Sequence, residues 1–382
     1  MTRALISTSC RNTRYDKPSG HLFVFDLEKR ELIQTCEIIE PPYREVDPNP
    51  RGGFRGLKGI NIENNILAMA NASSIFLYDN HWILLKEIQH PSCAGIHDIV
   101  LLNGEVWVTS SRNDLLCCFD IQGNLKKIID IRTLNTISTI TQNEIPPLSS
   151  SESYFRGKVN YRDPRTHDHY MTDRLHINSL EFMNQHQILL SVGLIRQIDQ
   201  QALHQINNFI KNKIKTNLID NLLHRLGHIT HKKTTNNKPV TTITKRATKS
   251  LLISLDLTGD ESLVLSLENC KVPSHSVRIL QDNTAIYLNS TTGELIRFKP
   301  DTSEILDKVK IGNTFLRGAR ELPDSKILLG DNNVLLLYDY STKNIIFDLP
   351  ITPDLNEAIF DIQLLPDGFD LPPASFVKKS AQ

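Results

Sequence analysis

The chain has 382 residues, 40% of them hydrophobic and 23% charged, and its 43 lysines and arginines balance its 43 aspartates and glutamates. This composition excludes collagen-like, disulfide-scaffold and wholly disordered proteins, and the zero net charge gives no reason to expect nucleic acid as a partner. Residues 1–10 contain no apolar stretch of signal-peptide length, and every apolar run falls short of the roughly 18 residues that a membrane helix needs. We therefore expect a cytoplasmic protein, and six buried, reduced cysteines because no CxxC pair is present.

Short apolar segments with the length and composition of strands follow one another along the chain. Three of them begin it, at residues 4–8, 22–27 and 32–39. Five groups of four then follow, at residues 59–62, 66–70, 75–79 and 82–88; 99–102, 106–110, 115–120 and 125–129; 177–182, 188–192, 251–257 and 262–267; 277–280, 285–289, 295–299 and 305–311; and 319–322, 326–330, 334–339 and 345–349. Turn sequences such as Asn103-Gly104 separate the segments. A lone segment at 360–365 ends the series.

The lone last strand and the three first strands together supply one more group of four. Four antiparallel strands have the size of one propeller blade, and a ring that is closed by strands from both ends of the chain leaves no open sheet edge. The sequence therefore predicts an all-β fold: a six-bladed β-propeller in which N- and C-terminal strands close one blade.

The spacing of the innermost strands indicates two insertions. The residues expected at the start of these strands are separated by 42, 79, 99, 42 and 43 positions, and they are Arg55, His97, His176, His275, Arg317 and Phe360. The two long steps exceed one blade. We therefore predict a single propeller over residues 1–382, with an insertion between blades at 131–170 and a helical insertion within a blade at 195–249.

The second insertion carries a charge that the neutral total conceals. Residues 195–249 contain eleven basic and two acidic side chains, a net charge of +9 that leaves −9 for the rest of the chain. Apolar residues recur at every fourth position from Ile198 to Leu226, which is typical of amphipathic helices. Such helices could pack on the rim of the propeller, cap it as a lid, or dock on a protein partner or an anionic membrane surface.

The starts of the inner strands converge at one mouth of a propeller, so residues far apart in the sequence should meet there. The expected set is Arg55, His97, His176, His275 and Arg317, with Asp98, Asn178, Ser276 and Asp361 one or two positions further on. Histidine makes up only 13 of the 382 residues, so three histidines at six equivalent positions indicate a functional site.

Several kinds of chemistry fit this set. Neutral imidazoles from His97, His176 and His275 could ligate a divalent transition metal. Arg55 and Arg317 favour instead a small anionic ligand, which Asp98 and Asn178 would help to position. A histidine beside arginines could also be the nucleophile in sulfuryl, phosphoryl or acyl transfer, or serve lyase-type chemistry. The structural alternative is that these are hydrogen-bonded residues lining a water-filled channel.

Three short motifs resemble the inner strands of arylsulfate sulfotransferases: GIHD at 95–98, LHINS at 175–179 and SHS at 274–276. That family is a six-bladed propeller that transfers sulfuryl groups through a central histidine. The resemblance implies that His275 is the nucleophile and that His97 and His176 support it. The motifs PSHSVR at 273–278 and FLRGAR at 315–320 are also similar to a bacterial group of propellers without a settled activity.

The sequence thus leads to two hypotheses. The first is a propeller that binds a small anion at the histidine and arginine pocket and, if it is an enzyme, transforms it. A metal-dependent enzyme with a metal at the three histidines is the alternative to this hypothesis. The second is a non-catalytic scaffold that reaches a protein or membrane through 195–249. Two weaker motifs are the glycine-rich loop at 51–59, as a phosphate cradle, and THDHY at 166–170, as a metal site.

Overall fold

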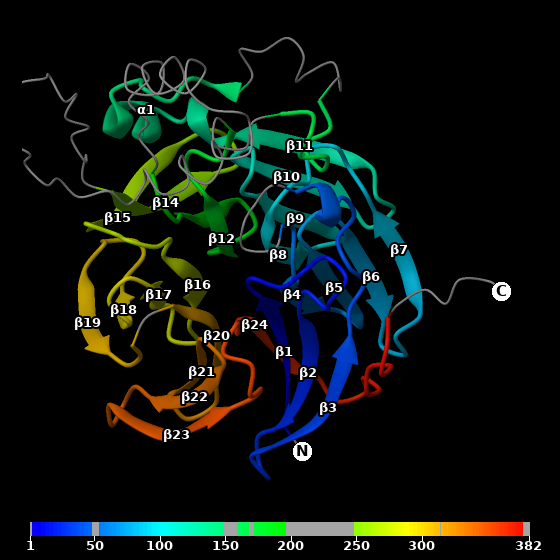
Figure 1. The fold of residues 1–382 in the computed structure, drawn as a ribbon. Helices are drawn as coiled ribbons and strands as arrows, with labels where there is room; N and C mark the ends of the chain where they lie inside the picture. Colours follow the sequence, from blue (N-terminus) through cyan, green and yellow to red (C-terminus); the bar gives the residue numbers. More distant parts are fainter. Residues whose placement is uncertain are drawn as a thin grey trace, which may run out of the picture.

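The computed structural model describes residues 2–47, 53–148, 159–167, 172–195, 248–313 and 315–376. Within these residues, 24 strands form six four-stranded antiparallel sheets, which stand side by side around a common axis (Figure 1). The prediction of a six-bladed β-propeller is therefore confirmed.

Each blade has one strand at the axis and three further out, and its strands are named in that order. Blade I consists of β24 (Glu357–Leu365), β1 (Arg3–Cys10), β2 (His21–Asp26) and β3 (Glu31–Glu37), and blade II of β4 (Leu57–Glu63), β5 (Ile66–Asn71), β6 (Ile75–Asp79) and β7 (Leu84–Ile88). Blade III consists of β8 (Ile96–Leu102), β9 (Glu105–Ser110), β10 (Leu115–Asp120) and β11 (Leu125–Asp130), and blade IV of β12 (Ile177–Phe182), β13 (Gln187–Val192), β14 (Lys249–Asp256) and β15 (Glu261–Glu268). Blade V consists of β16 (His275–Ile279), β17 (Ala285–Asn289), β18 (Glu294–Phe298) and β19 (Ile305–Lys310), and blade VI of β20 (Leu316–Leu322), β21 (Lys326–Asp331), β22 (Val334–Asp339) and β23 (Asn344–Pro350).

The hydrophobic core lies between the blades rather than at the axis. Successive residues of a strand point to opposite faces of its sheet, so a middle strand contributes to two cores at once. On β21, Leu328 packs toward blade I, whereas Leu329 packs toward blade V. On β13, Leu189 and Leu190 likewise belong to different cores. This double burial explains why the middle strands are continuous apolar runs instead of alternating patterns.

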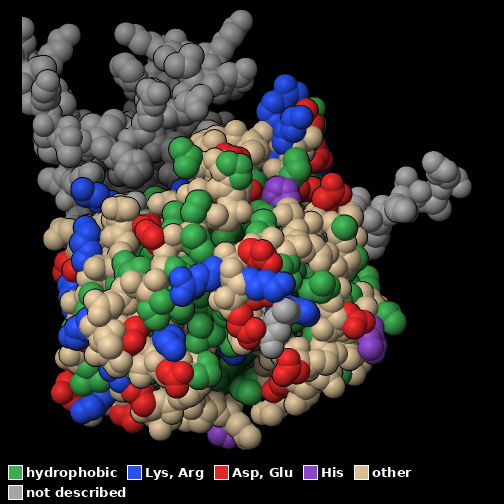
Figure 2. Space-filling view, turned by 90° about the horizontal axis from the view of Figure 1, so that it is seen from below, with side chains coloured by type: hydrophobic (Ala, Val, Ile, Leu, Met, Phe, Trp, Pro, Cys, Tyr) green, Lys and Arg blue, Asp and Glu red, His purple; other side chains and the backbone are tan. Residues whose placement is uncertain are grey.

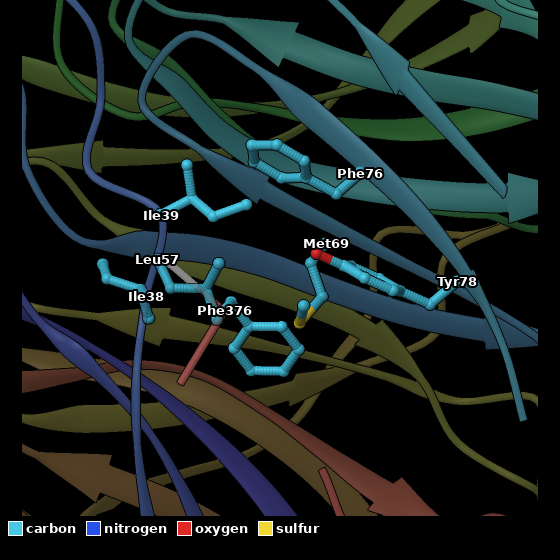
Figure 3. A pocket seen from close by; sticks show the side chains of 7 residues that line it. All are labelled: Ile38, Ile39, Leu57, Met69, Phe76, Tyr78 and Phe376. Atoms are coloured by element: carbon cyan, nitrogen blue, oxygen red, sulfur yellow. The ribbon is translucent and has the colours of Figure 1, made fainter. Parts of the chain in front are cut away.

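The ring is closed by strands from the two ends of the chain. The last strand, β24, pairs with the first, β1, in an antiparallel register that joins Cys10 to Glu357. The segment after β24 continues beneath blade II, where the ring of Phe376 lies 5.5 Å from that of Tyr78 and 5.6 Å from that of Trp82. Phe376 lines a small apolar crevice, with a cavity volume of about 10 Å³, together with residues such as Leu57 and Met69 (Figure 3). This segment therefore covers the junction between blades I and II.

The segments predicted as insertions lie between described strands, and a large part of each lies outside the described residues. The described part of 131–170 lies between blades III and IV and contains η2 (Ile131–Thr133) and a short helix, α1 (Asn135–Thr141), that the sequence did not predict. Asn135 and Thr136 donate their backbone N–H groups to Glu261 of β15, at 2.6 and 3.2 Å. The insertion at 195–249 connects β13 to β14 within blade IV.

The amphipathic helices predicted for the second insertion fall on residues 196–247, which lie outside the described residues. The docking of these helices on a protein partner or a membrane surface therefore stays a prediction. In the described part of the chain, no helix combines the length and the apolarity required to cross a membrane. On the propeller face shown in Figure 2, basic and acidic side chains are interspersed.

Candidate functional site

One residue from each blade meets at the axis of the propeller, at the end where the inner strands begin. These residues, which we call the axial cluster, are Lys58 on β4, His97 on β8, His176 directly before β12, His275 on β16, Arg317 on β20 and Phe360 on β24. The ring centroids of His97 and His176 lie 4.7 Å apart, and those of His97 and His275 lie 6.0 Å apart. Five of the six positions are those that the spacing indicated, and the exception is Lys58.

Breaks in strand register accompany this arrangement. The pairing of β16 with β17 slips between residues 275 and 277, and that of β20 with β21 slips between residues 317 and 319. The unpaired residues at these points, Ser276 and Gly318, have left-handed backbones with φ of 57° and 63°. A bulge of this kind re-aims the neighbouring side chains, and in this ring it places residues of consecutive blades around one point.

Phe360 lies in contact with the charged members of the cluster. The Nζ atom of Lys58 is 3.9 Å from the centroid of its ring, and the Cζ atom of Arg317 is 4.9 Å from it. The rings of His97 and His275 lie 5.4 and 6.2 Å away. The face of an aromatic ring attracts cations, so Phe360 holds two positive charges near the axis without neutralising either.

The hydrogen bonds of His97 define its tautomer. Its Nδ1 atom lies 2.6 Å from the carbonyl oxygen of Gly95 and 2.8 Å from the hydroxyl of Ser111. A carbonyl only accepts, so Nδ1 carries the hydrogen and Nε2 carries the lone pair. Burial, and then the charge of Lys58, hold the pKa of His97 well below its ordinary value. At neutral pH His97 therefore offers a neutral Nε2 that can accept a proton.

Two carboxylates, those of Asp173 and Asp114, hold the ring and the backbone of His176 in place. Its Nδ1 atom lies 3.1 and 3.2 Å from the two carboxylate oxygens of Asp173. The backbone N–H groups of residues 174–176 donate to Asp114, which also forms an ion pair with Arg132 at 2.8 Å. This network fixes the position of the ring, and the sequence motif around His176 gave no sign of it because Asp114 and Arg132 come from blade III and the insertion that follows it.

His275 is the most enclosed of the three histidines, with 2% of the residue exposed. Its Nε2 atom is buried and has no hydrogen-bond partner among the described residues. Burial, followed by the charge of Arg317, holds the pKa of His275 well below its usual value. The ring is therefore neutral near pH 7, and a buried nitrogen without a partner is a costly feature that structural histidines avoid.

Lys58 takes the place that the spacing assigned to Arg55. Arg55 lies in the loop before β4 and donates to the carbonyl oxygen of Gly53 at 3.1 Å. Lys58 is 6% exposed, and its ammonium forms no hydrogen bond or ion pair with any described residue. Burial, with the charges of Arg55, Arg317 and Arg11, holds the pKa of Lys58 well below its ordinary value. Regular blade spacing favoured Arg55, since a register break on β4 is not visible in the sequence.

The two polar residues predicted to help bind a ligand have partners within the protein. Asp98 accepts hydrogen bonds from the Ser179 hydroxyl at 2.9 Å and from the backbone N–H of Leu180 at 3.0 Å. Asn178 donates its side-chain amide to the carbonyl oxygen of Ser274 at 2.7 Å, whereas its buried Oδ1 atom has no partner among the described residues. Both side chains thus connect adjacent blades.

Arg278, on blade V, contacts carboxylates from three other blades below the axial cluster. Its guanidinium lies 3.2 Å from a carboxylate oxygen of Asp98 on β8, 3.0 Å from one of Asp361 on β24 and 3.6 Å from one of Glu181 on β12. These carboxylates raise the pKa of Arg278 even though burial opposes them. Sequence reasoning singled out Asp98 and Asp361 but missed the arginine between them, which follows His275 by three positions.

A cavity of about 310 Å³ lies at the other end of the inner strands, lined by residues that include Glu181, Arg278 and Arg320. Burial raises the pKa of Glu181 to about 7, although Arg278 opposes the shift. The two ends of the axis therefore differ: one holds the ammonium of Lys58, which forms no ion pair within the described residues, and the other holds a carboxyl group, that of Glu181, whose pKa is near neutrality.

The ligand nitrogens of the three axial histidines do not all lie within 4.8 Å of one another. In the described residues, one group of three metal-ligating side chains has its ligand atoms within 4.8 Å of one another, and that group is Cys10, His21 and Glu357. Of the weaker motif at 166–170, His167 packs edge-on against Tyr161 at 5.0 Å, and residues 168–170 lie outside the described part of the chain. Residues 51 and 52 of the glycine-rich loop also lie outside it.

Comparisons with known proteins support the fold. No protein-family model and no curated protein matches the sequence. A chain in the crystal structure of a nidogen/laminin complex is similar with a TM-score of 0.54 at 8% identity, over 96% of this chain and 99% of that one. A protein of unknown function from Bacteroides caccae is similar with a TM-score of 0.50 at 7% identity, over 95% and 98%.

Virginiamycin B lyase from Staphylococcus aureus is less similar, with a TM-score of 0.42 at 11% identity over 78% of this chain and 71% of that one. At 8% and 7% identity, the similarities to the nidogen/laminin chain and the Bacteroides caccae protein show a shared fold alone. The resemblance to arylsulfate sulfotransferases accordingly depends only on the three short histidine motifs.

Proposed function

We propose that the protein binds a small anionic ligand at the axial cluster, with Lys58 and Arg317 as positive contacts and His275 as the group that reacts with the ligand. The observation that carries this proposal is the isolation of Lys58. A buried ammonium group is strongly destabilising unless an opposite charge accompanies it or it gives up its proton. No carboxylate of the described residues pairs with Lys58, so a ligand is the natural source of the missing negative charge.

The same axis contains a matched internal comparison. Arg278, at a similar depth, has carboxylates from three blades around it, and its charge is fully compensated within the fold. At the axial cluster the groups whose charges act on His275 are Arg317, His97, His176 and Lys58, and all of them are basic. A phosphate, sulfate or carboxylate group would complete this end of the axis as the aspartates complete the other.

The binding proposal predicts saturable stabilisation by anions. Phosphate, sulfate and a small dicarboxylate, each added at low millimolar concentration, should raise the thermal midpoint above that in sodium chloride of equal ionic strength. A ligand at a hundred times its Kd adds about 2.7 kcal/mol to the free energy of unfolding. Calorimetric unfolding across the titration measures this. An increase that is linear in concentration and equal for all salts would reflect general exclusion from the surface and would contradict the proposal.

The reactive role assigned to His275 predicts a separation of stability from turnover. Exchanging His275 for phenylalanine keeps an aromatic ring and removes a buried nitrogen that has no partner, so the free energy of unfolding should stay within about 1 kcal/mol of the wild-type value or rise above it. Release of nitrophenol from 4-nitrophenyl sulfate or phosphate, with phenol as the acceptor, should be lost. The ester bond to nitrophenolate would break as the bond to Nε2 forms, and phenol would then take the group from the histidine.

Two results would contradict this role. Turnover that is equal in wild type and in His275→Phe would place the chemistry elsewhere. A wild-type protein that saturates with anions but releases no nitrophenol from either ester would leave the axial cluster a binding site and remove the transfer step.

A further inference from the structure

Three side chains with different metal-ligand atoms meet where the two ends of the chain join. Cys10 ends β1, His21 begins β2 and Glu357 begins β24, and these are three adjacent strands of blade I. Cys10 and Glu357 are direct cross-strand partners. The sulfur, one imidazole nitrogen and one carboxylate oxygen all lie within 4.8 Å of one another. None of the three belongs to the axial cluster.

The geometry is close to what a tetrahedral metal requires. Zinc binds thiolate at about 2.3 Å and imidazole or carboxylate at about 2.0–2.2 Å, so its ligand atoms stand roughly 3.3–3.8 Å apart. Small side-chain rotations reach that spacing from the present arrangement, in which the Nδ1 atom of His21 lies 2.7 Å from a Glu357 oxygen. Hydroxyl groups of Thr8 and Thr352 hydrogen-bond to the same carboxylate and hold it in place.

The surroundings favour a cation. The charged groups that act on the Cys10 thiol are the carboxylates of Glu357, Asp354 and Glu40. Cys10 and Glu357 are each 3% exposed, whereas 23% of the His21 side chain reaches solvent and leaves a path by which an ion can enter. This is the reverse of the axial cluster, where the charges around a buried group are positive.

We propose that Cys10, His21 and Glu357 bind zinc and that the metal ties the N-terminal strands β1 and β2 to the C-terminal strand β24. Sulfur, imidazole and carboxylate ligands together select zinc among abundant cations, because calcium and magnesium prefer sites made of oxygen alone. Hydrogen bonds between β24 and β1 close the ring of blades at this point. A metal shared by three strands would strengthen that closure without any part in the chemistry at the axis.

The first test measures zinc and stability together on full-length protein without an affinity tag. After treatment with a chelator and dialysis, zinc should rebind at one equivalent per chain, and free zinc at a hundred times its Kd should shift the unfolding equilibrium about a hundredfold toward the folded state. Magnesium and calcium should have no such effect. Cys10→Ala should lose both the equivalent of zinc and the shift. Cys36→Ala is the matched control, since Cys36 is also a buried thiol of blade I, on β3. It should retain both, because Cys36 is not one of the three proposed ligands.

The second test begins with the wild-type protein, so its first measurement does not depend on the folding of a variant. Cobalt(II) bound at this site should show the charge-transfer absorption of a thiolate ligand, and zinc should displace it. His21→Gln should weaken cobalt binding, whereas the exposed His81→Gln should not. Absence of the thiolate band overturns the proposal. Zinc binding that survives Cys10→Ala also overturns it. If such binding is lost in His97→Gln, the metal belongs to the axial cluster.

Discussion

Replacing Arg278 by methionine should lower the free energy of unfolding by about 3 to 5 kcal/mol. Arg278 is the positive partner of Asp98 and Asp361, which come from blades III and I and are 4% and 3% exposed. Removing the guanidinium leaves these two carboxylates buried and unpaired at the axis. The cost arises from the remaining charges, because methionine replaces most of the lost volume. Urea denaturation at neutral pH measures the difference.

Two further variants test this explanation. Arg297→Met, on β18 of the same blade, removes an ion pair with Asp282 that is partly exposed to solvent, and it should cost no more than about 1 kcal/mol. Adding Asp98→Asn and Asp361→Asn to Arg278→Met should recover part of the lost stability, since the uncompensated charges are then absent. A loss that is equal in Arg278→Met and Arg297→Met would mean that the ion pairs of Arg278 do not hold the ring together.

Exchanging Lys58 for methionine should weaken anion binding by about 2 kcal/mol or more, which is about thirtyfold in Kd. The ammonium is buried over the ring of Phe360 and forms no ion pair within the described residues, so its charge is available to a ligand. The free energy of unfolding in the absence of anions should not fall in this variant. It should rise if burying the charge of Lys58 destabilises the wild-type protein. Isothermal titration with phosphate or sulfate, together with calorimetric unfolding, separates the two effects.

The matched control is Lys310→Met, which removes an exposed ammonium from the outer strand of blade V. It should leave the anion Kd within about twofold of the wild-type value. If both variants weaken binding equally, the anion interacts with the overall surface charge rather than with the axial cluster. If Lys58→Met destabilises the protein while anion affinity is unchanged, Lys58 has a structural role that its contacts do not reveal.

The architecture could be predicted from the sequence because a propeller repeats one simple unit. Each blade needs four short apolar strands with turns between them. The strands that remain unassigned at the two ends of the chain number four together, so pairing them with each other completes the last blade. The short helix α1 was missed because NTISTIT, at 135–141, has no helical pattern of its own and is anchored through Glu261 of a neighbouring blade. Local sequence does not record such a long-range partner.

The candidate site was predictable only in part. Spacing placed His97, His176, His275, Arg317 and Phe360 at equivalent positions, and the structure brings all five together. Spacing also chose Arg55 over Lys58, because a bulge shifts the strand by a few residues without changing its composition. Asp98 was assigned to a ligand, but its oxygens accept hydrogen bonds from Ser179 and Leu180 and pair with Arg278. No local pattern distinguishes a carboxylate that meets a ligand from one that meets an arginine 180 positions away.

By itself, the sequence determined the class of fold, the number of blades, the closure by both ends and the convergence of three histidines, since all of these follow from periodicity. Only the tertiary structure decided which charges are compensated. Arg278 is surrounded by carboxylates, Lys58 is not, and Cys10, His21 and Glu357 form a group across the closure of the ring. Compensation depends on distances of a few ångströms between residues hundreds of positions apart, and a one-residue bulge in a strand is enough to change them.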